Sequence, residues 1–385
     1  MKTVALIPRV LATLSLGVAL AINAIAPTAA ASRPPAHPTA AQGATGQLDA
    51  YFQRLVHAHA FRGAVLIARG NTIVLSKGYD VADVAHGRPN TPHTAFRIGS
   101  ITDQFTAAAI LQLQDSGKLR LQDHVCPYVA PCPKAWGPIT IEQLLVGSAG
   151  IPDYRYASAP NTLTMPTALR NPTTVAYLLA LIKSKPLDFK PGTALDSVNS
   201  TYVVLGYIIE KVSRQSYADY LLAHVIRPLG LTQTGFGQGR YAVAQQAAGY
   251  ASWRHPSSAS IDVSVPYASG ALYSTVEDLY RFDQALRGGK IFSRASVGAM
   301  FSPRKVYCPR FCALGQSAGG MGYAWDISTQ NRRESFGWAS FLPGFASVQE
   351  IYPANNATII VLTNMDGVNL QAITKTCQTA LFGRP

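Results

Sequence analysis

The feature that most constrains the fold is a largely apolar segment from Phe105 to Leu113, which contains three consecutive alanines. Apolar residues on nearly all sides of a helical pattern predict a helix that is buried on most of its faces. Gly117 follows this segment and suits the left-handed position at which helices commonly stop. We therefore expect a central helix that begins at Ser100 and ends near Gly117.

Ser100 and Asp103 lie at the start of this helix, and their spacing fits two interpretations. Unpaired N–H groups and the helix dipole stabilise negative charge at a helix start, so the Ser100 hydroxyl is a candidate nucleophile. Ser-x-x-Asp also fits a capping box, in which both side chains bond helix-terminal N–H groups. On these two residues alone, capping is the preferred interpretation.

The two ends of the chain are predicted to form strands. Residues 63–68 and 73–79 flank Arg69-Gly70-Asn71, which is typical of a hairpin, and a helical pattern precedes them at 48–56. Strands are also expected at 321–325, 345–351 and 358–362, before a final helix at about 370–381. These patterns predict one sheet to which both ends of the chain contribute.

The middle of the chain, from about 119 to 300, is predicted to be mostly helical. Thr140-Ile-Glu-Gln143 fits a capping box that opens a helix, and helical patterns recur at 173–183, 201–212, 217–225 and 276–286. The fold class is therefore α+β, with an antiparallel sheet from both chain ends, flanking helices and a helical lobe. A cleft between sheet and lobe would place Ser100 at a binding site.

The N-terminus has the pattern of a secretory signal peptide over residues 1–31. Lys2 and Arg9 precede an apolar run, and Pro27-Thr-Ala-Ala-Ala31 provides a small-residue cleavage site. An uncleaved anchor is the alternative. Residues 32–46 are predicted to be a flexible linker, which leaves 47–385 as one domain. We expect an exported protein, periplasmic or extracellular, with no transmembrane segment after cleavage.

Composition narrows the classes of partner. The 385 residues are 48% hydrophobic and only 14% charged, which is typical of a globular chain with a large core. The formal charge of +13 would favour an anionic cell-envelope surface. No recognised motif or Arg/Lys–aromatic array supports nucleic-acid binding. Because the basic residues are scattered, a solvated surface is the default explanation of the charge.

The five cysteines fit an oxidising compartment. Cys126 and Cys132 flank one short loop and Cys308 and Cys312 another, so two short-range disulfides are expected, with Cys377 left free or buried. No histidine lies near either pair at ligand spacing, so we expect no zinc site. Nothing in the sequence indicates another metal or a cofactor.

The segment around Ser100 resembles the nucleophile segment of penicillin-recognising serine hydrolases, the group with class C β-lactamases, D-alanyl-D-alanine carboxypeptidases and related esterases. The likeness runs from about residue 47 to 382. It includes Leu144–Tyr154, which is similar to the family's Leu-Leu-x-His-x-Ser-Gly-Ile-Pro-Asp-Tyr with Gly147 at the His position. The further similar segments are Pro191–Lys211, Ala268–Leu279 and Phe341–Ser347.

The resemblance also shows where this chain departs from the family. The family has Ser-x-x-Lys, in which the Lys helps to take the Ser proton, but here the fourth residue is Asp103. The Tyr-x-Asn motif reads Ser197-Val198-Asn199, so the proton-moving phenol is a serine and the Asn that binds the substrate amide remains. The third motif, His or Lys, Thr or Ser, then Gly, reads Trp338-Ala339-Ser340, and Phe341 follows.

Each of these residues also has a purely structural interpretation. Ser197 fits an ordinary loop hydroxyl, and Trp338 fits a strand residue that fills an unused groove. Asn199 fits equally well a substrate ligand and a turn residue that bonds its own backbone. Asp103 could accept the Ser100 proton one turn away, but a carboxylate of ordinary pKa is a weak base for a hydroxyl unless burial raises that pKa.

Three functional hypotheses follow. The first is an exported homologue with impaired catalysis, whose cleft binds a peptide, a cell-wall fragment or a partner protein. The second is an active hydrolase that uses Ser100 with Asp103 as a non-standard base. The third is a basic envelope-binding protein that does not use its cleft. Because the position of the family's cation is now acidic, a cleft ligand is expected to be neutral or cationic, with an apolar part facing Trp338.

Overall fold

The computed structural model describes residues 40–155, 171–196, 198–237, 239, 242–253, 261–304, 320–330 and 332–383. The chain divides into two units, Met1–Pro38 and Thr39–Pro385, and all the described residues belong to the second. The expected signal peptide, the disulfide between Cys308 and Cys312, and Ser197 lie outside the described residues.

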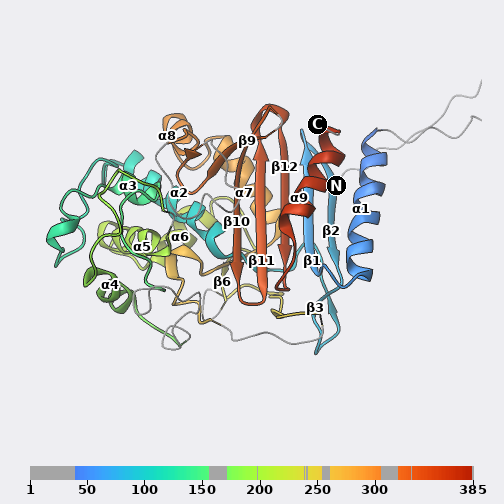
Figure 1. The fold of residues 1–385 in the computed structure, drawn as a ribbon, viewed down its shortest axis with the longest axis horizontal. Helices are drawn as coiled ribbons and strands as arrows, with labels where there is room; N and C mark the ends of the chain where they lie inside the picture. The colour runs from blue at the N-terminus through green and yellow to red at the C-terminus, as the bar shows by residue number, and fades with distance from the viewer. Residues whose placement is uncertain are drawn as a thin grey trace, which may run out of the picture. The chain divides into compact units, whose positions relative to one another are not determined.

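A seven-stranded antiparallel sheet is built from strands near both ends of the second unit, as predicted (Figure 1). The strand order is β2-β1-β12-β11-β10-β9-β8. Neighbouring β1 and β12 come from opposite ends of the unit and pair with Val65 opposite Val361. The strands are β1 (Gly63–Arg69), β2 (Thr72–Tyr79), β8 (Gly320–Met321), β9 (Asp326–Gln330), β10 (Arg333–Leu342), β11 (Phe345–Tyr352) and β12 (Ala357–Thr363).

Both faces of the sheet are covered, which explains why β1 is a continuous apolar run. Ala64, Leu66 and Ala68 belong to a large core with α2 (Thr102–Asp115) and α7 (Val276–Arg287). Val65 and Ile67 face a second core with α1 (Ala40–His57) and α9 (Leu370–Phe382). The side of the sheet that faces α2 is therefore the side on which Ser100 lies.

The remaining helices form the lobe that the sequence predicts, and Figure 1 shows α3 to α6 gathered away from α1 and α9. Helix α2 is buried along most of its length, including its three alanines, and packs against α5 and α6. It ends at Asp115, and Gly117, whose φ is +69°, follows in the left-handed conformation expected after a helix end. The lobe helices are α3 (Ile141–Leu145), α4 (Val175–Lys183), α5 (Asn199–Ser213), α6 (Tyr217–Leu221) and α8 (Arg294–Met300).

Short elements complete the described fold. Two small sheets pair β3 (Val81–Asp83) with β4 (Arg88–Pro89), and β7 (Leu272–Ser274) with β5 (Phe96–Arg97) and β6 (Gly235–Phe236). The single turns are η1 (Gly99–Ile101), η2 (Lys134–Trp136), η4 (Leu222–Ile226), η6 (Tyr267–Ser269) and η8 (Pro353–Asn355).

The structure confirms the capping box at Thr140 and Gln143, in which each side chain bonds the other's backbone N–H. Three local predictions are wrong. Residues 40–46 belong to α1 rather than to a linker. The expected strand 321–325 stops at Met321 and is followed by a turn in which the Gly322 N–H bonds the Trp325 carbonyl at 2.7 Å. The expected helix 217–225 changes to a π-helical turn after Leu221.

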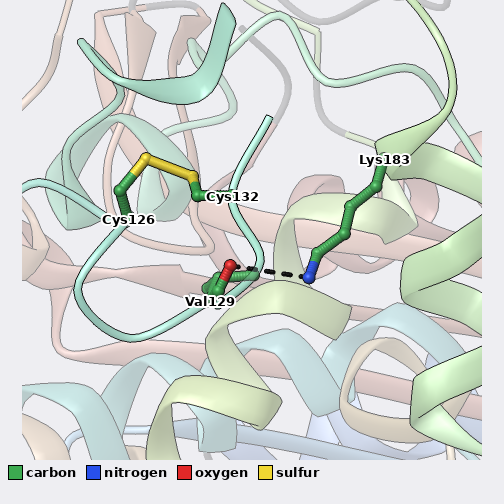
Figure 2. Close-up of a disulfide and its surroundings, with 4 residues drawn as sticks. All are labelled: Cys126, Val129, Cys132 and Lys183. Carbon is green, nitrogen blue, oxygen red and sulfur yellow. Dashed lines mark hydrogen bonds between the residues drawn. A yellow bond between two sulfur atoms is a disulfide. The ribbon is translucent and has the colours of Figure 1, made fainter. Parts of the chain in front are cut away.

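One of the two expected disulfides is observed, between Cys126 and Cys132, and Cys377 is free and buried as predicted. Figure 2 shows the side chain of Lys183 reaching from α4 toward the loop that this disulfide closes, where its ammonium lies 3.5 Å from the Val129 carbonyl oxygen. Among the described residues, none of the helices combines the length and the hydrophobicity that a membrane span requires.

Candidate active site around Ser100

Ser100 lies in η1, at the point where β5 gives way to α2. The Ile98 N–H bonds the Leu272 carbonyl at 3.1 Å, which continues the pairing of β5 with β7. Gly99 then adopts a φ of +51°, and a Cβ there would lie 2.1 Å from Ser340 Oγ. Glycine is therefore required before Ser100 by both backbone conformation and close contact. Ser100 itself remains partly exposed.

Two serines of the large sheet bond the backbone of the segment from Ile98 to Ser100. Ser340 on β10 and Ser347 on β11 are direct cross-strand partners. The Ser340 hydroxyl accepts a hydrogen bond from the Ser100 N–H at 2.7 Å, and the Ser347 hydroxyl donates to the Ile98 carbonyl at 3.0 Å. The structure therefore brings two predicted site residues, Ser100 and Ser340, into contact, although 240 positions separate them in the sequence.

Asp103 does not act as a cap. The N-cap position of α2 is Ile101, and neither η1 nor α2 has a side-chain cap hydrogen bond, so the preferred capping interpretation of Ser100 and Asp103 is wrong. Asp103 is only 3% exposed, and its Oδ1 has no hydrogen-bond partner among the described residues. Burial raises the pKa of this carboxyl well above its ordinary value, and the positive charge of Arg155 opposes that shift.

Three buried tyrosines lie within electrostatic reach of Asp103, because its negative charge contributes to raising their pKa values after the larger effect of burial. No sequence motif marks these tyrosines as site residues. Their hydroxyls already have other partners: Tyr154 donates to the Val265 carbonyl (2.9 Å), Tyr202 donates to the Leu145 carbonyl (2.8 Å), and Tyr217 pairs with Thr106 Oγ1 (2.6 Å). None of these phenols bonds the Asp103 carboxyl.

Asn199 is the first residue of α5 and is half-buried. Its N–H donates to Asp153 Oδ2 at 3.3 Å, while its side-chain amide makes no hydrogen bond to the described residues. The alternative of a side chain bonded to its own backbone is therefore not observed. Asp153 also binds Arg155, with an Nη2–Oδ2 distance of 2.8 Å. Arg155 is a cation near the site that the sequence analysis missed, since no motif marks it.

Trp338 and Phe341 lie on opposite faces of β10, because side chains alternate along a strand. Trp338 is on the same face as Ser340 and packs, partly buried, against the large core, which agrees with its structural interpretation. Its Nε1 is buried without a hydrogen-bond partner among the described residues. Phe341 is 68% exposed, so its side chain does not join Ser340 and Trp338 on the Ser100 side.

The arrangement thus has a serine at a helix start, a buried carboxyl one turn later and a free amide on α5. A serine hydroxyl needs a neighbouring base to attack a carbonyl, and Asp103 is the one acidic side chain on the adjoining turn of α2. Within the described part of the chain, no group of three or more His, Cys, Asp or Glu side chains could hold a metal ion.

Comparison with known proteins gives consistent matches over most of the chain. The Beta-lactamase family matches residues 48–378. The putative penicillin-binding protein PbpX of Bacillus subtilis (strain 168) is 33% identical over 248 residues, which are 63% of this chain and 59% of PbpX, so less than two thirds of that relative is spanned. A penicillin-binding protein of the same strain is 28% identical over 359 residues, which are 88% of this chain and 76% of the relative.

A solved structure gives the same result in three dimensions. The octameric penicillin-binding protein homologue from Pyrococcus abyssi superposes with a TM-score of 0.74 at 27% identity. The superposition covers 88% of this chain and 77% of the other.

Proposed function

Because the chain belongs to the beta-lactamase family and has the fold of its penicillin-binding homologues, we propose that it is an exported serine-hydrolase homologue whose acyl transfer is impaired. The site around Ser100 binds a small molecule, a peptide or cell-wall fragment, or a partner protein. Membership of the family indicates the fold and the position of Ser100. The ligand has to be inferred from the side chains around Ser100, because a fold alone does not determine function.

The observation that carries this proposal is that a buried carboxyl, Asp103, stands where the family has the Lys that helps to take the Ser proton. Burial favours the neutral form of this carboxyl and raises its pKa, and the neutral form cannot take the proton of Ser100. Removing the activating partner of a serine nucleophile typically slows catalysis by about 10³–10⁶-fold. The Tyr of the second motif and the cation of the third are also replaced, by Ser197 and Trp338.

The same carboxyl determines the charge of the preferred ligand. When Asp103 is protonated it is neutral, so it neither attracts nor repels a charged group of the ligand strongly. As the pH rises through its raised pKa it becomes an anion beside Ser100, which repels a carboxylate and attracts an ammonium group. Asn199 offers an amide to a peptide group, and the part of the Trp338 ring that is not buried against the core offers an apolar surface, so a neutral or cationic peptide fits the site.

The test is calorimetric titration of the wild-type protein with a D-Ala-D-Ala peptide and with the C-terminal amide of that peptide. We expect tighter binding of the amide, with a preference that grows as the pH is raised. Asp103→Asn is the matched control, because it removes the charge and keeps the shape, and it should remove the pH dependence of the preference. If the wild type binds the free carboxylate more tightly, a cation such as Arg155 serves the site and the proposal is wrong.

One observation favours the second hypothesis, an active hydrolase. Burial raises the pKa of Asp103, and a carboxylate of raised pKa is a stronger base for the Ser100 proton than one of ordinary pKa. A fluorophosphonate probe distinguishes the two functions, since stable labelling that disappears in Ser100→Ala would require an activated serine. A homologue with impaired acyl transfer should not be labelled by the probe.

Export is supported by the signal-peptide pattern of residues 1–31 and by the Cys126–Cys132 disulfide, which is typical of oxidising compartments. The formal charge of +13 would add affinity for anionic envelope polymers. If polymer binding is the whole function, it should persist after mutations of Ser100 and the residues around it.

A further inference from the structure

Transfer of an acyl group to a serine requires hydrogen-bond donors for the oxygen that becomes negative. The N–H of the nucleophilic residue itself is well placed for this, because it lies beside the reacting hydroxyl. In this chain the Ser100 N–H is already engaged, since it donates to Ser340 Oγ at 2.7 Å. A backbone N–H has one proton, so a substrate oxygen can bond it well only after the Ser340 hydroxyl has moved away.

This contact is fixed by its surroundings. Ser340 is only 6% exposed, and its hydroxyl lies so close to Gly99 that a Cβ there would be 2.1 Å from it. Its cross-strand partner Ser347 holds the Ile98 carbonyl at the other end of the same turn. The hydroxyl of Ser340 thus lies against the Ser100 N–H as part of a two-serine clamp on the segment from Ile98 to Ser100.

We infer that Ser340 is a specificity-determining residue, whose hydroxyl oxygen takes the position that an acyl oxygen would occupy at Ser100. The inference rests on the proposed function in that it takes Ser100 as the centre of the site. It deepens that function, because Ser340 selects against ligands that need the Ser100 N–H, such as acyl donors. Ser340 does not select against ligands that bind through Asn199 and Trp338.

An arylboronic acid tests this directly, because it reports on the site without turnover. The Ser100 oxygen adds to boron, a B–O bond forms, the hydroxyl proton goes to solvent, and the negative charge rests on the tetrahedral boronate. One boronate oxygen then needs the position that Ser340 occupies. We expect Ser340→Gly and Ser340→Ala to bind phenylboronic acid at least tenfold more tightly than the wild type, measured by boron NMR and intrinsic fluorescence. Ser340→Thr keeps the hydroxyl and should resemble the wild type.

Two controls separate this role from a purely structural one. Ser100→Ala in the Ser340→Gly background should abolish the gain, since the boron then has no oxygen to accept. The amide proton of Ser100 should exchange faster in Ser340→Ala than in Ser340→Thr, even if the glycine variant does not fold. Equal boronate affinity in the wild type, Ser340→Ala and Ser340→Gly, including no binding by any of them, would overturn the inference. The ligand preference assigned to Asp103 would be unaffected, because it is measured on the wild type with peptides.

Discussion

The triple variant Asp103→Lys, Ser197→Tyr, Trp338→His is expected to bind a D-Ala-D-Ala peptide at least tenfold more tightly than the wild type. These substitutions restore the residues of the family motifs. Two unit charges about 4 Å apart interact by about 4 kcal/mol at an effective dielectric of 20. A lysine at position 103 therefore adds attraction for a ligand carboxylate, where Asp103 offers none below its raised pKa and repulsion above it. A tenfold change in affinity corresponds to about 1.4 kcal/mol. This is less than the full charge interaction, because burying a lysine at position 103 opposes part of it.

Calorimetry with the peptide acid and its amide measures this effect. Asp103→Asn alone is the matched control: it removes the repulsion that an ionised Asp103 exerts above its pKa and gains no attraction. Affinity should recover before turnover, because the Ser340 hydroxyl still occupies the Ser100 N–H in the triple variant. Thermal unfolding checks that each variant is folded. An unchanged preference between acid and amide in a folded triple variant would show that position 103 does not control the ligand's charge.

Asp283→Asn is expected to stabilise the protein by roughly 3–5 kcal/mol near pH 8, since each unit of pKa shift corresponds to about 1.4 kcal/mol. Asp283 lies on α7, fully buried, and accepts a hydrogen bond from Gln349 on β11. Burial raises its pKa from 3.8 to about 8, against the opposing effects of Arg287 and of the bond from Gln349. A raised acid pKa means that the folded state keeps its proton while the unfolded state loses it.

The sign of the pH dependence follows from that difference. The contribution of Asp283 to the free energy of unfolding is fully favourable below about pH 4, where the carboxyl is protonated in both states. It is lost as the pH rises toward 8, because the unfolded state then releases the proton more readily than the folded state. Asparagine cannot ionise, and its NH₂ could donate to Gln349 Oε1, which has no partner among the described residues.

Guanidinium unfolding across this pH range should therefore show a smaller loss of stability in Asp283→Asn than in the wild type. Asp49→Asn is a suitable control, because hydrogen bonds from Lys77 and Tyr79 lower the pKa of Asp49, so its loss should not stabilise. A destabilised Asp283→Asn at pH 8 would contradict the assignment.

The sequence predicts the elements whose patterns are local. The hairpin of β1 and β2, the buried α2 with its alanines and the capping box at Thr140 all follow from periodicity and turn chemistry. The sheet from both chain ends follows from where the strand patterns lie. The strand prediction at 321–325 is wrong because it relies on the apolar residues after Met321. A turn can bury apolar side chains as well as a strand does.

The candidate site is less predictable because it depends on contacts between distant segments. Ser-x-x-Asp is the same pattern whether Asp103 caps the helix or is buried beneath it, and only the tertiary structure decides. The bond from the Ser100 N–H to Ser340 depends on the register of β10 against η1, which the sequence of either segment alone does not contain. The resemblance identified Ser340 as a departure from the family's glycine, but the structure shows what its hydroxyl contacts.

The most direct test of impaired acyl transfer is the intact mass of the purified protein after incubation with fluorescent penicillin. A β-lactam that acylates a serine hydrolase opens its ring on the nucleophile and adds its whole mass. We expect no mass gain in the wild type, as in Ser100→Ala. A stoichiometric gain that is present in the wild type and absent in Ser100→Ala would show that Ser100 is an active nucleophile and would contradict impaired acyl transfer.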